Sequence, residues 1–357
     1  MVDLGTLIHQ AKAVRCGEGN YPVLSMTMHD GLVFQNDKFK KTIASKDKSD
    51  YKVVKRNQLV ISFPIDEGVL ATQRIVDAGI VSPAYGIWDI DQEMILPEFL
   101  EYALRCDRAL NYYKAKLRGS TARRRSLPTS TLLAYTVPLP DISEQEHILN
   151  VVHKTQKVIS GRTEEISLLD NLIKARFVEM FESQAWERVR AGTIMLNMRN
   201  GVSPSNIGTC PAKVLTLSAI TQGGFNPGSW KDGMFDVEPP LEKRVTASDF
   251  YMCRGNGNKK LVGVGVYSKE NRCDLIFPDT AIAATVDLQR ICLPYLFYAW
   301  QQPFVRKQIE AGARTTNGTY KINQGVVSNI ELVLPPLKLQ TQFAAFVEQV
   351  DKSKVVV

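Results

Sequence analysis

The longest periodic pattern in the chain is a series of apolar positions between residues 143 and 182. Its steps alternate between four and three residues, which is typical of a helix whose apolar seam packs against a second helix. The seam positions are Ile148, Val152, Thr155, Ile159, Arg162, Ile166, Leu169, Ile173, Arg176 and Met180. At about 1.5 Å per residue the helix would span about 60 Å, more than the width of a small domain. The pattern predicts a helix that projects or bridges, and a core helix of one globular domain is the alternative.

A second, shorter helical pattern follows Pro335 and Pro336 and occupies residues 338–357. Phe343, Val347 and Val350 recur at helical spacing, so they fall on one face. This helix has roughly half the length of the first. We expect the two helices to pair antiparallel and to hold the flanking segments at a fixed distance.

The segments on either side of the long helix alternate short strand-like runs with turns that contain Gly, Pro, Asn and Asp. We expect strands at 58–63, 79–81, 132–137, 260–267 and 330–334. Helices are expected near 97–117 and 294–311, each after a proline. The pattern therefore predicts an α+β fold that occurs twice.

The chain is also duplicated in its sequence. The stretch 139–145, which begins Leu139-Pro140 and ends with Gln145, returns at 334–340 with Leu334-Pro335 and Gln340. Residues 4–8 correspond to 191–195, and 97–102 correspond to 294–298. A repeat of this length exceeds the units of about 20–50 residues found in solenoids. We therefore expect a first domain at 1–142, the long helix at 143–184, a second domain at 185–337 and the second helix at 338–357.

The charge of the chain favours a polyanionic partner. The 357 residues carry a formal net charge of +7, and both repeats are basic while the long helix between them is not. Such a surface attracts nucleic acid, although a solvated, mildly basic surface is the alternative. The absence of a long apolar run and of a leader-like start predicts a cytoplasmic protein without a membrane span. The six cysteines lack CxxC spacing, which predicts free thiols.

Motifs of catalysis are absent from the sequence. There is no GxxxxGK[ST] loop for a nucleotide. Pro239-Pro240 lacks the Asp or Asn before it and the aromatic residue after it that an amino-methyltransferase uses. Asp279 and Asp287 resemble a nuclease carboxylate pair, but Gln289 stands in place of the lysine. We therefore predict no catalytic residue and no metal site.

Two basic, hydroxyl-rich segments, each expected to form a loop after a helix, occupy corresponding positions in the repeats and are the main candidates for contact with DNA. Arginine can grip phosphate or read guanine, and Ser, Thr and Asn can contact bases or backbone. A solvated loop whose glycine caps the preceding helix is the alternative. The first segment contributes Arg118, Ser120, Thr121, Arg123, Arg124 and Arg125, and the second contributes Arg314, Thr315, Thr316, Asn317 and Lys321. Weaker candidates are Lys38, Lys40, Lys41, Arg254, Lys259 and Lys260.

Together these features resemble the specificity subunit of type I restriction-modification systems. The resemblance rests on Leu139-Pro140, Gln145 and Ile148, on the heptad helix with its end at residues 177–181, and on the duplication. It implies two tandem homologous target-recognition domains separated by long conserved helices that form an antiparallel coiled coil. Each domain would read one half of a split double-stranded DNA target, and the coiled coil would set the gap between the halves.

The resemblance also implies partners and cofactors. Methyltransferase (modification) subunits would dock on the scaffold, and motor-nuclease (restriction) subunits can join them. S-adenosylmethionine, ATP and Mg are expected in these partner subunits, and this chain would bind no cofactor. The expected coiled-coil and partner interface comprises Ile148, Val152, Ile159, Ile166, Leu169, Ile173, Phe177 and Met180 on the first helix, and Phe343, Val347 and Val350 on the second.

The short second helix departs from the symmetric pattern. We expect it to leave the seam beyond Ile166 unpaired, so that a stripe of Leu169, Ile173, Phe177 and Met180 would drive self-association or bind a partner. Two other interpretations remain. The chain could be a stand-alone two-domain DNA-binding protein or regulator without enzyme partners, or a fragment of a fused restriction-methylation polypeptide.

Overall fold

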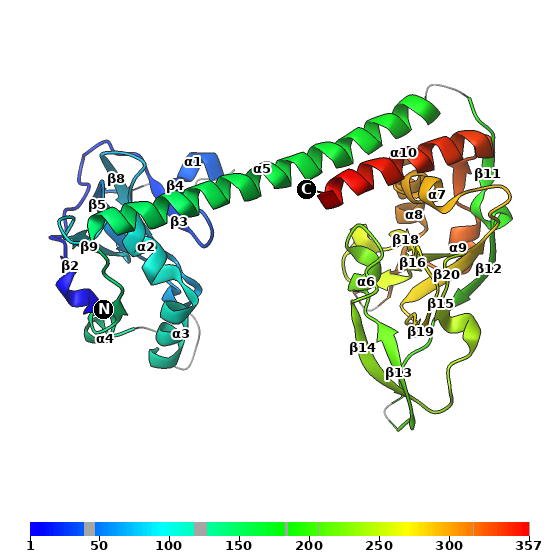
Figure 1. Ribbon diagram of the computed structural model, residues 1–357, viewed down its shortest axis with the longest axis horizontal. Helices are drawn as coiled ribbons and strands as arrows, with labels where there is room; N and C mark the ends of the chain where they lie inside the picture. Colours follow the sequence, from blue (N-terminus) through cyan, green and yellow to red (C-terminus); the bar gives the residue numbers. More distant parts are fainter. Residues whose placement is uncertain (39–46, 118–126, 183–184, 206, 317, 357) are drawn as a thin grey trace. The chain divides into compact units, whose positions relative to one another are not determined.

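The computed structural model describes residues 1–357 except 39–46, 118–126, 183–184, 206, 317 and 357. The chain forms two compact units, Met1–Ser160 and Gly161–Val357. Both units mix helices and strands, as the α+β prediction requires (Figure 1). Among the described residues, no helix has both the length and the apolar character needed to cross a membrane.

Unit 1 contains an antiparallel sheet of four short strands with three further strand pairs around it. Its strands are β1 (Val2–Asp3), β2 (Ile8–Gln10), β3 (Leu24–Thr27), β4 (Gly31–Phe34), β5 (Lys52–Lys55), β6 (Leu59–Ile61), β7 (Leu70–Thr72), β8 (Ala78–Val81), β9 (Gly86–Ile90) and β10 (Thr136–Val137). The main sheet has the order β2-β9-β6-β7, and β1–β10, β3–β4 and β5–β8 form the pairs. The strands expected at 58–63 and 79–81 are confirmed as β6 and β8.

Two expectations for unit 1 were wrong in detail. The helix expected at 97–117 is two helices, α2 (Pro97–Arg105) and α3 (Asp107–Lys116), because Cys106 between them is extended. The strand expected at 132–137 begins as α4 (Thr129–Leu133) and only β10 is extended. A short apolar run does not distinguish a strand from one buried turn of helix. The remaining helix is α1 (Gln35–Lys38).

Unit 2 has two four-stranded sheets, a three-stranded sheet and one strand pair. Its strands are β11 (Arg188–Arg190), β12 (Met195–Asn200), β13 (Cys210–Leu215), β14 (Trp230–Phe235), β15 (Arg244–Val245), β16 (Asp249–Cys253), β17 (Gly255–Asn256), β18 (Gly265–Tyr267), β19 (Arg272–Ile276), β20 (Ala281–Val286), β21 (Arg314–Thr316), β22 (Thr319–Lys321) and β23 (Glu331–Val333). The sheets have the orders β12-β20-β16-β18, β14-β13-β19-β15 and β17-β22-β21, and β11 pairs with β23.

The helices of unit 2 follow the same plan as those of unit 1. They are α6 (Ser218–Thr221), α7 (Leu293–Trp300), α8 (Pro303–Gly312) and α9 (Gln324–Ser328). The helix expected at 294–311 is thus divided into α7 and α8, since Pro303 starts a new helix. The strand expected at 260–267 is extended only at its end, in β18, because Lys259–Leu261 forms a 3₁₀ turn. The strand expected at 330–334 is confirmed as β23.

The duplication read from the sequence is present in the structure. The order β2-β9-β6-β7 of unit 1 matches β12-β20-β16-β18 of unit 2, and the pair β1–β10 matches β11–β23. Individual hydrogen bonds repeat as well. Leu4 N donates to Tyr135 O and Ala191 N donates to Ile330 O, each at 2.7 Å. The hydroxyls of Thr6 and Thr193 each donate at 2.8 Å to the carbonyl three residues earlier.

The long helix is α5 (Ile142–Phe181), which agrees with the predicted 143–182 to within one residue at each end. The second helix is α10 (Leu337–Val356). Within unit 2, Phe343 lies 5.5 Å from Phe177 between ring centroids, and Lys354 Nζ lies 2.7 Å from Asp170 Oδ1. Later residues of α10 therefore meet earlier residues of α5, so the two helices pair antiparallel, as predicted.

The expectation of an unpaired seam beyond Ile166 was wrong. Ile173 is 0% exposed and Phe177 is 3% exposed, and Leu169 and Met180 pack against the same core. Because α10 runs antiparallel, its first turns lie beside the C-terminal end of α5 and cover that end. Phe343, Val347 and Val350 are buried there, as expected.

Several apolar side chains are exposed along α5, and Val178, near its C-terminal end, is 46% exposed. Val151 and Val158 are exposed in unit 1, and Ile166, Leu168 and Leu172 are exposed in unit 2. Ile159 is also largely exposed, while Ile148 packs against the core of unit 1 and Val152 is half-buried.

Candidate nucleic-acid interface

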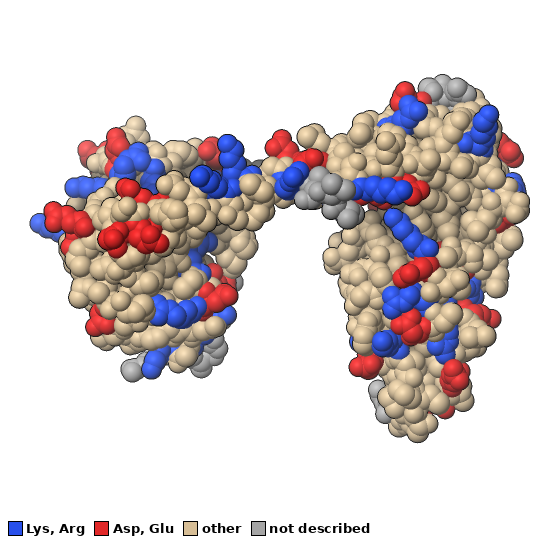
Figure 2. All heavy atoms as spheres, viewed as in Figure 1, with Lys and Arg blue, Asp and Glu red and all other residues tan. Residues whose placement is uncertain are grey.

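Charge alone does not mark an interface on the face of the protein that Figure 2 shows. On the face drawn in Figure 2, lysine and arginine side chains are interspersed with aspartate and glutamate in both units. Ion pairs such as Arg244–Glu238 and Arg272–Asp274, each at 2.9 Å, neutralise part of the positive charge. An interface for a polyanion is therefore to be sought among cations that have no acidic partner.

Such cations gather on the three-stranded sheet β17-β22-β21 of unit 2. β21 and β22 form a hairpin in which Thr316 lies opposite Thr319, and Gly318 has a φ of 74°. β17 pairs antiparallel with β22 and thereby brings Gly255 beside Lys321. The second basic segment is thus a β-hairpin with a third strand beside it. The expectation of a loop was wrong there.

The register of the hairpin assigns its side chains to two faces. Arg314 lies opposite Lys321, and Thr315 lies opposite Tyr320. Since successive residues of a strand point to opposite faces, Arg314 and Lys321 share one face while Thr315 and Tyr320 share the other. Lys259 Nζ lies 5.9 Å from the centroid of the Tyr320 ring, a cation–π distance. Each face therefore has its own cation.

Arg254 immediately precedes β17 and is held by its backbone. Its N–H donates to Thr280 O at 2.8 Å, and its carbonyl accepts from Ile322 N at 2.9 Å. Its guanidinium donates to the carbonyl of Asp279 at 3.1 Å. The half-buried Arg254 lines a hollow of 220 Å³ together with Arg314 and Lys321. Three of the predicted DNA-binding residues are therefore brought together, although Arg254 is about sixty positions away from the other two in the chain.

The turn that carries Lys259 and Lys260 is fixed from both sides. The Asn258 side chain accepts from Lys260 N at 3.0 Å, which caps the 3₁₀ turn. The guanidinium of Arg306 on α8 donates to Val262 O at 2.8 Å and to Lys260 O at 3.2 Å. Both lysine side chains are exposed at the surface next to the sheet.

The other candidates divide into two groups. Lys38 is described, and its Nζ lies 2.6 Å from Asp30 Oδ2, so its charge is neutralised within unit 1. The same contact with Lys38 holds the pKa of Asp30 below its usual value. Outside the described residues lie Lys40, Lys41, Arg118, Ser120, Thr121, Arg123, Arg124, Arg125 and Asn317, and of Thr316 only the backbone is described.

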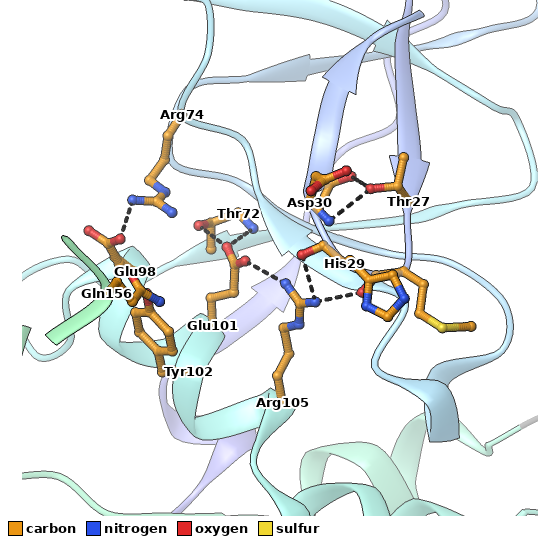
Figure 3. Close-up of polar contacts among 12 residues, drawn as sticks. Thr27, His29, Asp30, Thr72, Arg74, Glu98, Glu101, Tyr102, Arg105 and Gln156 are labelled. Carbon is orange, nitrogen blue, oxygen red and sulfur yellow. Dashed lines mark hydrogen bonds and ion pairs between the residues drawn. The ribbon is translucent and has the colours of Figure 1, made fainter. Parts of the chain in front are cut away.

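In unit 1, sequence reasoning missed a polar cluster that fixes the β3–β4 turn on α2. Arg105 donates to Met28 O at 2.6 Å and to the Glu101 carboxylate at 3.2 Å (Figure 3). That carboxylate also accepts from the N–H and hydroxyl of Thr72, at 2.8 and 2.7 Å. These are helix and strand residues with no recognisable spacing, so no sequence signal points to them.

The neighbouring cluster joins α5 to α2 within unit 1. Glu98 lies 2.7 Å from Arg74 and 2.9 Å from His153 Nε2. Burial would raise the pKa of Glu98, but the hydrogen bonds from His153 and Arg74 outweigh it and hold that pKa below its usual value. Gln156 on α5 donates to the Tyr102 hydroxyl at 3.0 Å. These contacts anchor the first part of α5 to α2 of unit 1.

Comparison with known proteins gives relatives of one kind, although no protein-family model matches the chain. It is 24% identical over 234 residues to the type I restriction enzyme EcoKI specificity subunit of Escherichia coli K12, which covers 60% of this chain and 50% of that protein. It is 19% identical over 278 residues to the StySPI specificity subunit of Salmonella potsdam, covering 72% and 59%. The chain thus spans about half the length of the relatives it matches.

Solved structures of the same kind of subunit share the fold of this chain. The S subunit of a type I restriction-modification system from M. genitalium superposes with a TM-score of 0.56 at 14% identity, covering 99% of this chain and 89% of that one. A chain from a structure described as the basis of complex assembly and conformational transition of the type I R-M system gives 0.58 at 16% identity, covering 99% and 90%. The chain is therefore similar in sequence to the specificity subunits of type I restriction enzymes, and it has the fold of a solved subunit of that kind.

Proposed function

We propose that the chain is the DNA-recognition subunit of a type I restriction-modification complex, and that each unit reads one half of a bipartite target. The observation that supports this most directly is the duplication. The same sheet order, the same strand pair and the same hydrogen bonds recur in both units, and they carry different basic segments at corresponding places. Two related readers that differ in their contact residues suit a target with two different halves.

In unit 2 the reading element is the sheet β17-β22-β21 with the turn at Lys259–Leu261. Its cations attract the phosphates, and the side chains of Thr315 and Tyr320 on the other face are suited to contact base edges. In unit 1 the corresponding role falls to Arg118, Ser120, Thr121, Arg123, Arg124 and Arg125. Phosphate contacts position the protein while base contacts select the sequence.

The chain supplies no catalytic group in this proposal. Methyltransferase subunits bring S-adenosylmethionine and perform the methyl transfer. Restriction subunits, where they join, bring ATP and Mg for translocation and cleavage. The complex acts in the cytoplasm, where the host's DNA is accessible to it.

A docking or self-association surface is assigned to the exposed apolar residues of α5. In unit 1 these are Val151 and Val158, which are 51% and 62% exposed, and in unit 2 they include Leu168 and Leu172, at 62% and 48%. The stripe expected to form this surface, Leu169, Ile173, Phe177 and Met180, is covered by α10 and is therefore not proposed for it. Exposed apolar rows on a helix are the kind of surface that a partner helix covers.

The experiment that tests the proposal is methylome sequencing of a host that expresses the chain together with candidate modification subunits. The expected result is a new methylated motif with two specific parts separated by unspecified bases, and a copurifying methyltransferase subunit. A chain that binds DNA but recruits no methyltransferase and changes no methylation would instead be a stand-alone regulator.

A further inference from the structure

The hollow beside the β21–β22 hairpin is built from three cations and no acid. Arg254, Arg314 and Lys321 line it, and the remaining lining residues are uncharged. A second hollow of 520 Å³ continues from it along α8 and α9 and shares Gly312, Arg314, Asn323 and Val326 with the first. That second lining also contains no aspartate or glutamate. The two hollows form one groove with all of its charge at the hairpin end.

None of the three cations has a carboxylate partner among the residues that the structure describes. The Arg254 guanidinium bonds a neutral carbonyl, and no ion pair joins Arg314 or Lys321 to an acid there. By contrast, Arg306 lies 3.4 Å from Glu310 and Arg244 lies 2.9 Å from Glu238, so these two arginines of unit 2 have acidic partners. Three like charges around one hollow repel one another. An anion in the hollow would attract all three cations and offset their mutual repulsion.

The walls of the groove are fixed by packing. A Cβ on Gly312 would lie 2.4 Å from Val326 Cγ1, so glycine allows α8 to end directly against α9. Ile322 is 3% exposed. The Asn323 side chain accepts from Val326 N at 2.9 Å, so it caps α9 and is not directed to a ligand. The groove therefore has an uncharged floor, and its cationic donors lie only at the hairpin end.

A site with donors only suits a phosphate better than a base. A phosphodiester presents two non-bridging acceptor oxygens that share one negative charge, and it has no donor, which matches guanidinium and ammonium groups that converge on one point. Most base edges present donors as well as acceptors, and they lie at the bottom of a DNA groove, where protruding side chains reach them. A recess between a hairpin and two helices instead accepts a group that projects from the DNA, which is the phosphate.

We propose that this groove holds one phosphate of the DNA backbone and sets the position of unit 2 on the duplex without selecting a base. The inference rests on the proposed function in taking DNA as the ligand. Arg254, Arg314 and Lys321 then act on the same phosphate, and the opposite face of the hairpin, with Thr315 and Tyr320, contributes sequence reading.

The test is the salt dependence of binding to a labelled duplex by the full chain, measured by fluorescence anisotropy. The slope of log Kd against log salt changes by about 0.9 for each phosphate neutralised. We expect the double variant Arg314→Ala/Lys321→Ala to lose about one phosphate's worth of slope, and Arg254→Gln to add little to that loss. The weakening should be equal for duplexes of different sequence.

Two controls make the result specific. Lys338→Ala removes an exposed cation of α10 that lies outside the groove, and it should leave the slope unchanged. Thr315→Ala alters the opposite face of the same hairpin and should also leave the slope unchanged. Circular dichroism identifies any variant that fails to fold, and Lys321→Gln alone then serves as the milder substitution.

Three outcomes would overturn the inference. The first is an unchanged slope in the double variant. The second is a loss of about two phosphates, which would place the cations on separate phosphates. The third is a loss confined to one duplex sequence, which would mean base reading. Because the slope needs no recognised sequence, it can be measured even if the wild-type chain shows no sequence preference. A wild-type chain without sequence preference would contradict the proposed function, while the slope would still test whether the groove binds a phosphate.

Discussion

Gln145 and Gln340 make the same three hydrogen bonds in the two halves of the protein, and both are fully buried. Gln145 accepts from Leu96 N at 2.8 Å and donates to Met94 O at 3.0 Å and Pro140 O at 2.9 Å. Gln340 accepts from Cys292 N at 2.9 Å and donates to Arg290 O at 3.0 Å and Pro335 O at 2.8 Å. The repeated glutamine therefore joins the start of each long helix to the start of a helix in its domain.

Replacing either glutamine should destabilise only the unit to which it belongs. Gln340→Leu removes these bonding partners from two carbonyls and one N–H, and we expect a loss of about 2–4 kcal/mol. Urea unfolding measures it, and Gln145→Leu should act on the transition of the other unit. Gln342→Leu, an exposed position on the same helix as Gln340, is the matched control. Equal losses for Gln340→Leu and Gln342→Leu would contradict the role of the buried bonds.

The middle of the α5–α10 contact should tolerate no charge. Ile173→Glu places a carboxylate among buried apolar side chains, and we expect unit 2 to lose roughly 3–5 kcal/mol of stability. The neighbouring Leu172 is 48% exposed, so Leu172→Glu should change stability by about 0.5 kcal/mol or less. Thermal unfolding of both variants measures the two losses of stability. A well-folded Ile173→Glu chain with unaltered stability would show that α10 does not cover this side chain.

The cluster around Glu98 should contribute to acid sensitivity. Its pKa is held below the usual value near 4.5 in the folded chain. A carboxyl with a lowered pKa stabilises the fold above its unfolded pKa, and this contribution disappears as the pH falls through the folded pKa. Glu98→Gln should therefore lower stability at pH 7 and flatten its decline below about pH 5. Glu93→Gln, at an exposed position nearby, should leave the profile of denaturation against pH unchanged.

The exposed apolar residues of α5 should matter for association and not for folding. Val158→Glu should reduce copurification of a modification subunit, or self-association in sedimentation experiments, because a charge replaces apolar contact surface. The unfolding temperature should be unaffected, since Val158 is 62% exposed. Lys157→Glu on the adjacent position is the control for charge alone. If Val158→Glu associates as well as the wild type, the partner surface lies elsewhere.

Several features of this fold follow from local sequence patterns. The heptad spacing from Ile148 to Met180 gives a helix nearly coincident with α5, and the repeated Leu-Pro with its later glutamine identifies the duplication. The division of 97–117 at Cys106 has no strong local signal. The hairpin β21–β22, in contrast, has a local sequence signal, since Asn317-Gly318 between threonines is typical of a two-residue hairpin connection.

Features that depend on distant residues were not accessible in this way. Arg254 reaches the hairpin only because β17 pairs with β22, a non-local contact that no periodicity reports. Which half of the α5 seam is covered depends on the direction in which α10 docks. The short length of the second helix had suggested that the seam beyond Ile166 would be the uncovered half. Both cases are decided by tertiary packing, which local sequence patterns do not report.

We expect each unit to read one half of a split DNA target, and selection of bound duplexes from a random library tests this most directly. The wild-type complex should select two specific sequences separated by unspecified positions. Thr315→Ala combined with Tyr320→Phe should relax only the half read by unit 2, by about 1–3 kcal/mol per lost base contact, and should leave the other half unchanged. A single continuous motif, or an equal change in both halves, would contradict the account.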